Sequence, residues 1–171
     1  QAGHGMSGRE ISLSNGDTLK IQDRIDHHTK TALSTIEEAS KQVDRINKNF
    51  ESYFANAISS PQGKYKAYVL KQSPKLDRLM ELLERNKIKH FTTGTSRISN
   101  GFDYSDGTTK SFTIDPGDII INANQTNGNL LQVLMEPEPV LSDSVTYDIT
   151  AWSLPHAYGI EAYALTSYLI T

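Results

Sequence analysis

The residues that could carry chemistry begin with a glycine-rich segment near the start of the chain. Gly3, Gly5 and Gly8 have the Gly-x-Gly-x-x-Gly spacing of loops that bind the pyrophosphate of a dinucleotide. Such a loop follows a strand and opens a helix, because free amide groups at the helix N-terminus hold the pyrophosphate. No strand pattern precedes Gly3, and residues 9–13 alternate like an extended segment. The sequence therefore does not predict a nucleotide site here.

The histidines are the next candidates, as metal ligands, since the chain has no cysteine. His27 and His28 are adjacent, so on a helix their side chains point about 100° apart and cannot reach one ion from the same turn. No histidine is followed three residues later by glutamate, and the sequence His-Glu-x-x-His does not occur. A zinc site needs several convergent ligands. We therefore predict no metal ligand and no cofactor in this chain.

Serine and aspartate could supply a nucleophile or a calcium site. No Gly-x-Ser-x-Gly elbow exposes a serine at a strand-to-helix turn, so a hydrolase would need a triad of scattered residues. Asp103, Asp106 and Asp115 lie in a polar stretch, but their spacing departs from the calcium loop of an EF-hand. Solvated turns are the preferred interpretation of these aspartates.

The length, composition and net charge of the chain limit its number of domains and its kinds of partner. A chain of 171 residues, 37% of them hydrophobic, fits one domain with an appended helix. The net charge of −3 and the scattered lysines and arginines predict no nucleic-acid partner. No apolar run reaches the roughly 18 to 20 residues that span a bilayer, so no membrane span is predicted. Because the chain enters a glycine-rich stretch directly after Gln1, we expect a piece of a longer protein.

The element that dominates the first third of the chain is a helix. After a short strand and an Asn15-Gly16 turn, apolar residues recur every three or four positions from residue 20 to residue 58. They predict one long amphipathic helix, whose apolar stripe we expect to pack on something outside this chain. Self-association through the helix is the alternative. The stripe comprises Ile21, Ile25, Ala32, Ile36, Ala39, Val43, Ile46, Phe50, Tyr53 and Ala57.

The remaining elements alternate between strand and helix. We predict strands at 64–70, 88–91, 118–122 and 160–170, with helices at 73–86 and 130–134. The crossover from the first strand to the second is expected to be parallel and right-handed. Between residues 92 and 111 the chain is rich in Gly, Ser, Thr, Asn and Asp, which predicts an irregular loop or short hairpin. The fold class is therefore α/β, with a small, mostly parallel sheet and flanking helices.

Several stretches together resemble the C-terminal region of large bacterial zinc carboxypeptidases. The resemblance covers nearly the whole chain, and the stretches that carry it are Asp23-Arg24-Ile25-Asp26-His27-His28, Gly117-Asp118-Ile119-Ile120-Ile121-Asn122, Asn124-Gln125-Thr126-Asn127-Gly128-Asn129-Leu130-Leu131, Leu134-Met135-Glu136-Pro137, Leu141-Ser142-Asp143-Ser144 and Tyr147-Asp148-Ile149-Thr150-Ala151-Trp152-Ser153-Leu154-Pro155.

The resemblance implies a function. In that family the zinc ligands and the general base lie upstream of the matched region, so no catalytic or metal residue is carried over and zinc belongs to an upstream peptidase domain. The matched region is similar to the class I glutamine amidotransferase-like fold, a flavodoxin-like sandwich. We therefore expect a non-catalytic accessory domain, secreted or periplasmic, whose partner is the upstream peptidase domain of the same chain.

The predicted organisation has two parts and two candidate surfaces. Residues 1–60 form a hairpin and the long helix, and residues 61–171 form the α/β accessory domain. Asp118, Asn122 and Gln125 lie at or near the ends of a buried strand, where open α/β sheets tend to bind ligands. Trp152 and Tyr158 offer amphipathic aromatic surface for a partner or for the core. An alternative function is a peptide- or glycan-binding module that acts through the 92–111 loop.

Overall fold

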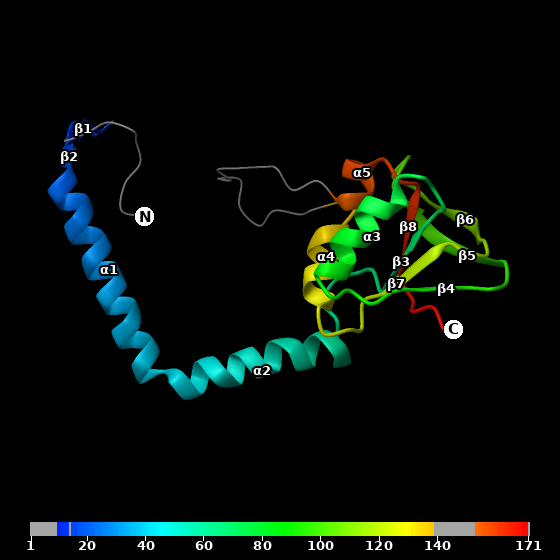
Figure 1. Cartoon of the computed structure of the whole chain (residues 1–171), viewed down its shortest axis with the longest axis horizontal. Helices are drawn as coiled ribbons and strands as arrows, with labels where there is room; N and C mark the ends of the chain where they lie inside the picture. The colour runs from blue at the N-terminus through cyan, green and yellow to red at the C-terminus, as the bar shows by residue number, and fades with distance from the viewer. Residues whose placement is uncertain (1–9, 14, 139–152, 171) are drawn as a thin grey trace. The chain divides into compact units, whose positions relative to one another are not determined.

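The computed structural model describes residues 10–13, 15–138 and 153–170, and it divides into two compact units, Gln1–Glu51 and Ser52–Thr171. Figure 1 shows the elements of both units. The predicted division into domains 1–60 and 61–171 stays a prediction. Trp152 lies outside the described residues.

The first unit contains a short hairpin and helices. Strand β1 (Glu10–Ser12) pairs antiparallel with β2 (Thr18–Lys20), and Gly16 adopts the positive φ of 89° that the turn requires. Helix α1 (Ile21–Lys41) follows directly, and the Asp23 carboxylate accepts a hydrogen bond from the Lys20 amide at its N-terminus. No residue of α1 is buried.

A second helix continues after a one-residue interruption. Helix α2 (Val43–Ser59) begins one residue after Gln42, where φ is −121° and ψ is 23°. The Gln42 amide donates to the Ala39 carbonyl, three residues back, instead of to a carbonyl four residues back. The predicted continuous helix is therefore two helices. Apolar periodicity does not reveal the break, because the step of four from Ala39 to Val43 is kept across it.

The second unit is a six-stranded sheet with helices. Its strands are β3 (Ala67–Leu70), β4 (Phe91–Thr92), β5 (Arg97–Asp103), β6 (Thr109–Ile114), β7 (Ile119–Asn122) and β8 (Ala162–Leu165). Its helices are the end of α2, α3 (Leu76–Arg85), α4 (Gly128–Met135) and α5 (Leu154–Tyr158). The strand order is β4-β7-β3-β8-β5-β6. Among the described residues, no helix is long and apolar enough to cross a membrane.

The prediction of a mostly parallel sheet is wrong. Every pair of neighbouring strands in this sheet runs antiparallel. The crossover through α3 joins β3 to β4, but β7 lies between those two strands and pairs with both. Glutamine amidotransferase-like and flavodoxin-like sandwiches are built on parallel strands, so the expected sandwich is overturned with the parallel sheet.

The central strands have the apolar pattern of parallel strands for a physical reason. Strands β3 and β8 are buried along their whole length, as parallel strands under helices are. Here both faces of an antiparallel sheet are covered, so the central strands have the same continuous apolar runs. A continuous apolar run is the same whether its strand pairs parallel or antiparallel, so it cannot predict strand direction.

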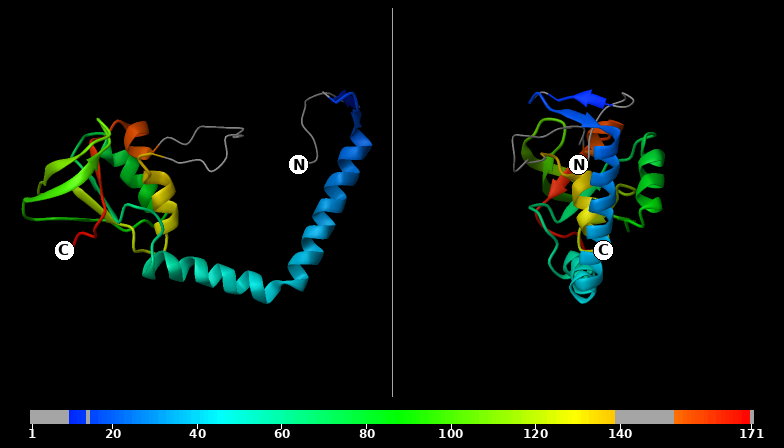
Figure 2. Two further views of the ribbon diagram at one scale, coloured as in Figure 1. Left: turned by 180° about the vertical axis from the view of Figure 1, so that it is seen from behind. Right: turned by 90° about the vertical axis from the view of Figure 1, so that its left-hand side faces the viewer.

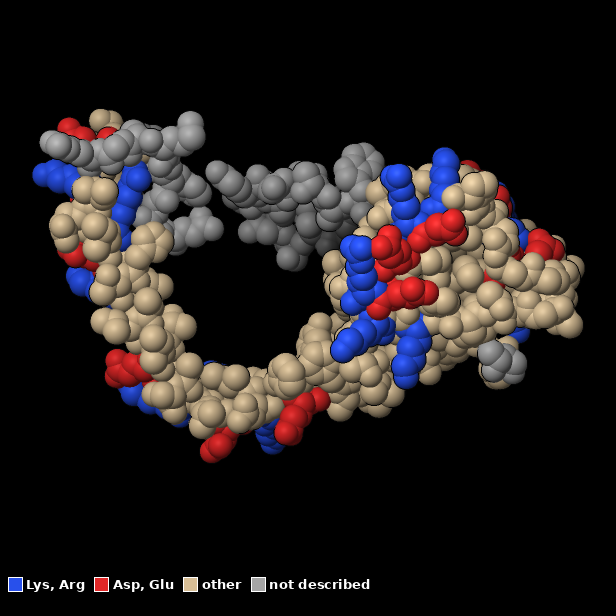
Figure 3. Space-filling view, viewed as in Figure 1, with Lys and Arg blue, Asp and Glu red and all other residues tan. Residues whose placement is uncertain are grey.

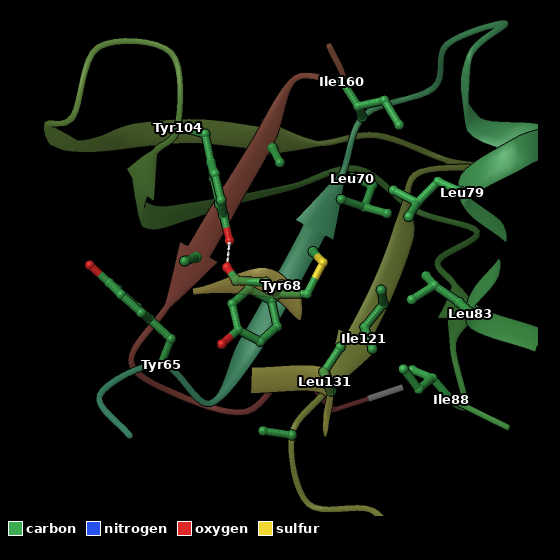
Figure 4. Close-up of a cluster of buried hydrophobic side chains, with 14 of the residues drawn as sticks. Tyr65, Tyr68, Leu70, Leu79, Leu83, Ile88, Tyr104, Ile121, Leu131 and Ile160 are labelled. Atoms are coloured by element: carbon green, nitrogen blue, oxygen red, sulfur yellow. Dashed lines mark hydrogen bonds between the residues drawn. The ribbon is translucent and has the colours of Figure 1, made fainter. Parts of the chain in front are cut away.

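Successive side chains of the central strands belong to two different hydrophobic clusters. Tyr68 and Leu70 of β3 and Ile121 of β7 face Leu79 and Leu83 of α3, as Figure 4 shows. The Tyr104 hydroxyl donates to the Met135 carbonyl in the same cluster. Figures 1 and 2 place α3, α4 and α5 on one side of the sheet. The alternate residues of the same strands belong to a second cluster, which comprises Ala67, Val69, Phe112, Ile114, Ile120, Tyr163, Leu165 and Leu169.

The polar stretch 92–111 is mostly regular structure. It contributes the second residue of β4, all of β5 and the start of β6, and β5 and β6 form a hairpin at one edge of the sheet. Phe102 and Phe112 anchor this hairpin to the two cores. Of the two forms expected for this stretch, the hairpin is present.

Candidate docking surface

Exposed apolar side chains lie along helices α1 and α2. Ile36 and Phe50 each expose 66% of their surface and Leu33 exposes 62%. Such exposure is unusual for a run of large apolar residues in a folded chain, and a contiguous exposed patch marks a surface that contacts another molecule. From here on, the apolar stripe means the large exposed members of the predicted stripe, without its alanines, together with Leu33. It comprises Ile21, Ile25, Leu33, Ile36, Val43, Ile46, Phe50 and Tyr53.

Three charged residues of α2 lie away from the stripe, whereas Arg45 lines a hollow together with Ile46. With about 100° between successive residues, Asp44, Lys48 and Glu51 fall on the other side of the helix from Ile46. In Figure 3 the charged side chains of α2 gather along one side of the helix, and uncharged residues cover the opposite side. On α2 the stripe is thus an apolar face that Arg45 borders.

The end of α2, from Ser52 onward, belongs to the second unit and packs closely within it. Ala57 is 1% exposed, and its carbonyl oxygen lies 3.2 Å from the position that a Cβ on Gly128 would occupy. The same Cβ would meet the Ala123 carbonyl oxygen at 2.1 Å. Glycine at the start of α4 is therefore what allows these backbones to approach so closely.

Asp118, one of the predicted ligand residues, is a buried structural carboxylate. It is 1% exposed, and its oxygens accept hydrogen bonds from Lys71 Nζ at 2.5 Å and from the Asp115 amide at 2.8 Å. The Gln72 amide adds a third, at 3.2 Å. These bonds hold the turn through Gly117, whose φ is 90°, against the end of β3. Asp118 thus has no face toward a ligand.

The two predicted amide residues act as clamps on backbone. Asn122 donates to the Leu169 carbonyl at 2.8 Å and accepts from its amide at 3.1 Å. Gln125 accepts from the Lys89 amide at 2.7 Å and donates to its carbonyl at 3.1 Å. Each side chain pairs with one residue as a neighbouring strand would, which pins the C-terminal segment and the loop before β4. Asn122 is the last residue of β7 and Gln125 follows the strand, whereas Asp118 precedes it, so the three do not form one site.

Tyr158 and the histidines complete the predicted candidates. Tyr158 is half-buried at the end of α5, packs on the first core and borders a hollow of about 520 Å³ with Lys75 and Arg78. His27 and His28 are exposed on α1. In the part of the chain that the structure describes, no three His, Asp or Glu side chains are placed to hold a metal ion.

The β5–β6 turn forms a polar hollow that sequence reasoning missed. It has a volume of about 540 Å³, and Asp103, Lys110, His156 and Glu161 are in its wall. Burial raises the pKa of Tyr163 to about 12, and the hydrogen bond that its hydroxyl donates to Glu161 adds to the shift. These residues come from two segments, Lys110 and His156 being 46 positions apart, so no sequence spacing could reveal the hollow.

Lysines pair with the three aspartates that were considered as calcium ligands and interpreted as solvated turns. Lys110 Nζ lies 2.5 Å from Asp103 and 2.9 Å from Asp106, and Lys71 Nζ lies 2.7 Å from Asp115. Hydrogen bonds from Lys110 and Thr108 lower the pKa of Asp106 to about 2. Burial raises the pKa of Asp103, but hydrogen bonds from Lys110 and Ser105 outweigh it and the net shift is downward.

These lowered pKa values predict an acid-sensitive hairpin. Where a carboxyl has a lower pKa folded than unfolded, its stabilising effect is complete above the unfolded value and is lost as pH falls through the folded one. The free energy of unfolding should therefore decrease between about pH 4 and pH 2. Urea titrations at several pH values measure it. In the variant Lys110→Gln the decrease should be shallower, and an equally steep decrease would contradict this assignment.

Comparison of the chain with protein-family models, with curated proteins and with solved structures found no match.

Proposed function

We propose that this chain is a non-catalytic accessory domain of a secreted or periplasmic zinc metallocarboxypeptidase, with a structural or positioning role. The sequence resemblance suggests the enzyme, and its zinc would be held by an upstream peptidase domain of the same protein. The observation that carries the positioning role is the apolar stripe, because α1 has no buried residue of its own. A helix of that kind gains most of its stability from a surface that it packs against.

The second observation that supports an accessory role is that the predicted polar ligand residues bond within the domain. Within the domain, Asp118 pairs with a lysine, and Asn122 and Gln125 form hydrogen bonds with backbone groups. They stabilise the sheet that carries α3 and α4. We therefore assign them to the scaffold and assign contact with other molecules to the stripe.

The mass and zinc content of the native gene product test this proposal. A product several times larger than 19.0 kDa that contains zinc and removes C-terminal residues from peptides is the expected result. The 171-residue chain alone should bind no zinc and show no such activity. A native product of the same size as this chain and free of zinc would overturn the proposal.

A second candidate function is peptide or glycan binding by the hairpin of the 92–111 stretch. The observation that favours it is the hollow at the β5–β6 turn, which offers charged and aromatic groups together. Thermal unfolding with panels of peptides and oligosaccharides measures it. A rise in the unfolding temperature that is lost in His156→Ala would favour this function over the accessory role.

A further inference from the structure

An open hollow lies between the last turns of α2 and helix α4, within the second unit. Its volume of about 420 Å³ is within the range usual for small-molecule sites. Residues three or four apart on each helix line it, because such residues share one face of a helix. We call it the amide hollow, and its lining comprises Tyr53, Asn56, Gln62, Asn129, Gln132 and Val133.

Contacts among backbone segments fix the walls of the amide hollow. The Ala57 carbonyl of α2 lies against Gly128 at the start of α4. In the amide orientation that satisfies both of its polar atoms, Gln132 donates to the Gln62 carbonyl at 2.9 Å and accepts from the Gly63 amide at 3.2 Å. This pair of bonds ties α4 to the loop after α2. A site whose walls are set in advance loses less entropy when a ligand enters it.

Three side-chain amides of the hollow remain available to a ligand. Asn56, Gln62 and Asn129 form no side-chain hydrogen bond with any residue that the structure describes. Asn56 and Gln62 are exposed, and Asn129 is half-buried. Each carboxamide can donate two hydrogen bonds and accept two. The amide hollow therefore offers both donors and acceptors.

The amide hollow also contains an aromatic ring, and none of the described residues that line it is charged. Tyr53 exposes 52% of its surface. Anions and cations are recognised by groups of opposite charge, so the lining favours a neutral ligand. A sugar fits both features, since its hydroxyl groups donate and accept as amides do and the C–H face of its ring packs on an aromatic ring.

A peptide is the other neutral ligand that carries donors and acceptors. Extended peptides bind by adding a strand to the edge of a sheet, and helical peptides bind by placing several apolar side chains in a groove. Of the described residues that line the amide hollow, none belongs to a strand and only Val133 is aliphatic. The hollow therefore matches a sugar better than a peptide.

We propose that the amide hollow binds a neutral oligosaccharide, with one sugar ring against Tyr53 and its hydroxyl groups on the three available amides. The inference goes beyond the accessory role, because it adds a ligand for the second unit and requires neither zinc nor a peptidase. It also differs from the second candidate function, because the sugar lies between α2 and α4 and not at the β5–β6 turn.

Titration of the whole 171-residue chain with neutral oligosaccharides tests the proposal. The probes are maltohexaose, cellohexaose and the tetramer of N-acetylglucosamine, which differ in linkage and in substituent. Calorimetry and saturation-transfer NMR should detect binding of at least one of them at millimolar concentration. Failure of all three to bind at that concentration would overturn the inference.

Variants of exposed residues locate the site. Asn56→Ala removes one amide and should weaken binding about fivefold, as expected for a lost neutral hydrogen bond. Tyr53→Ala removes the ring and should weaken binding by about tenfold or more. The matched control is Asn124→Ala, which removes an exposed amide outside the hollow and should leave the dissociation constant unchanged. Thermal unfolding of each variant checks that the second unit stays folded.

The remaining outcomes separate this inference from the two candidate functions. Sugar binding that survives Asn56→Ala and is lost in His156→Ala would overturn the site and favour the hollow at the β5–β6 turn. Binding of neutral peptides that depends on Tyr53, without binding of sugars, would overturn the class of ligand. A native product without zinc would overturn the accessory role and leave sugar binding by the amide hollow standing.

Discussion

Replacing Gly128 by alanine should lower the free energy of unfolding of the second unit by about 3 kcal/mol. The added Cβ would lie 2.1 Å from the Ala123 carbonyl oxygen and 3.2 Å from that of Ala57. Both obstacles are backbone atoms, so relief requires α4 to move away from α2 and from the end of β7. Urea unfolding followed by circular dichroism measures the loss.

The matched control for that variant is Gly94→Ala. Gly94 is exposed, and no atom lies within 4 Å of the position that its Cβ would take. The same change of residue should therefore alter the free energy of unfolding by less than about 0.5 kcal/mol. Equal effects at the two positions would show that α4 does not need its close approach to α2.

Replacing Asp118 by alanine should cost about 3 kcal/mol as well, for an electrostatic reason. The carboxylate is buried, and its loss leaves the amides of Gln72 and Asp115 without their acceptor. Lys71 also loses the closer of its two carboxylates. The free energy of unfolding by urea at neutral pH is the quantity to measure.

Asp115→Ala is the comparison that isolates burial. Asp115 also pairs with Lys71, at 2.7 Å, but 54% of its side chain is exposed. Solvent screens that pair, so its removal should cost no more than about 1 kcal/mol. A larger loss from Asp115→Ala than from Asp118→Ala would refute the view that the buried carboxylate organises this turn.

Short-range patterns predicted most of the elements. The hairpin turn at Gly16, helix α3 behind Ser73-Pro74 and strand β7 in its isoleucine run all depend on neighbouring residues. The apolar stripe was visible in the same way, since its period of three to four residues is a property of one helix. The interruption at Gln42 was not, because the apolar period continues through it.

The predicted ligand residues show where local reasoning ends. Asp118, Asn122 and Gln125 were identified correctly as polar residues at the ends of a buried strand. Their partners Lys71, Leu169 and Lys89 lie 36 to 47 positions away. Whether such a side chain faces a ligand or clamps backbone depends on those distant partners.

The sequence by itself determined helices α3 and α4, the buried strands β3, β7 and β8, and the amphipathic face of residues 21–53, since each follows from the placement of apolar side chains along one segment. Only the tertiary structure decided that all strand pairs are antiparallel, that the polar 92–111 stretch includes most of an edge hairpin, and that Gly128 lies against two carbonyl groups. Direction, neighbour and close approach depend on contacts between segments far apart in the chain, and periodicity along one segment carries no information about its neighbours.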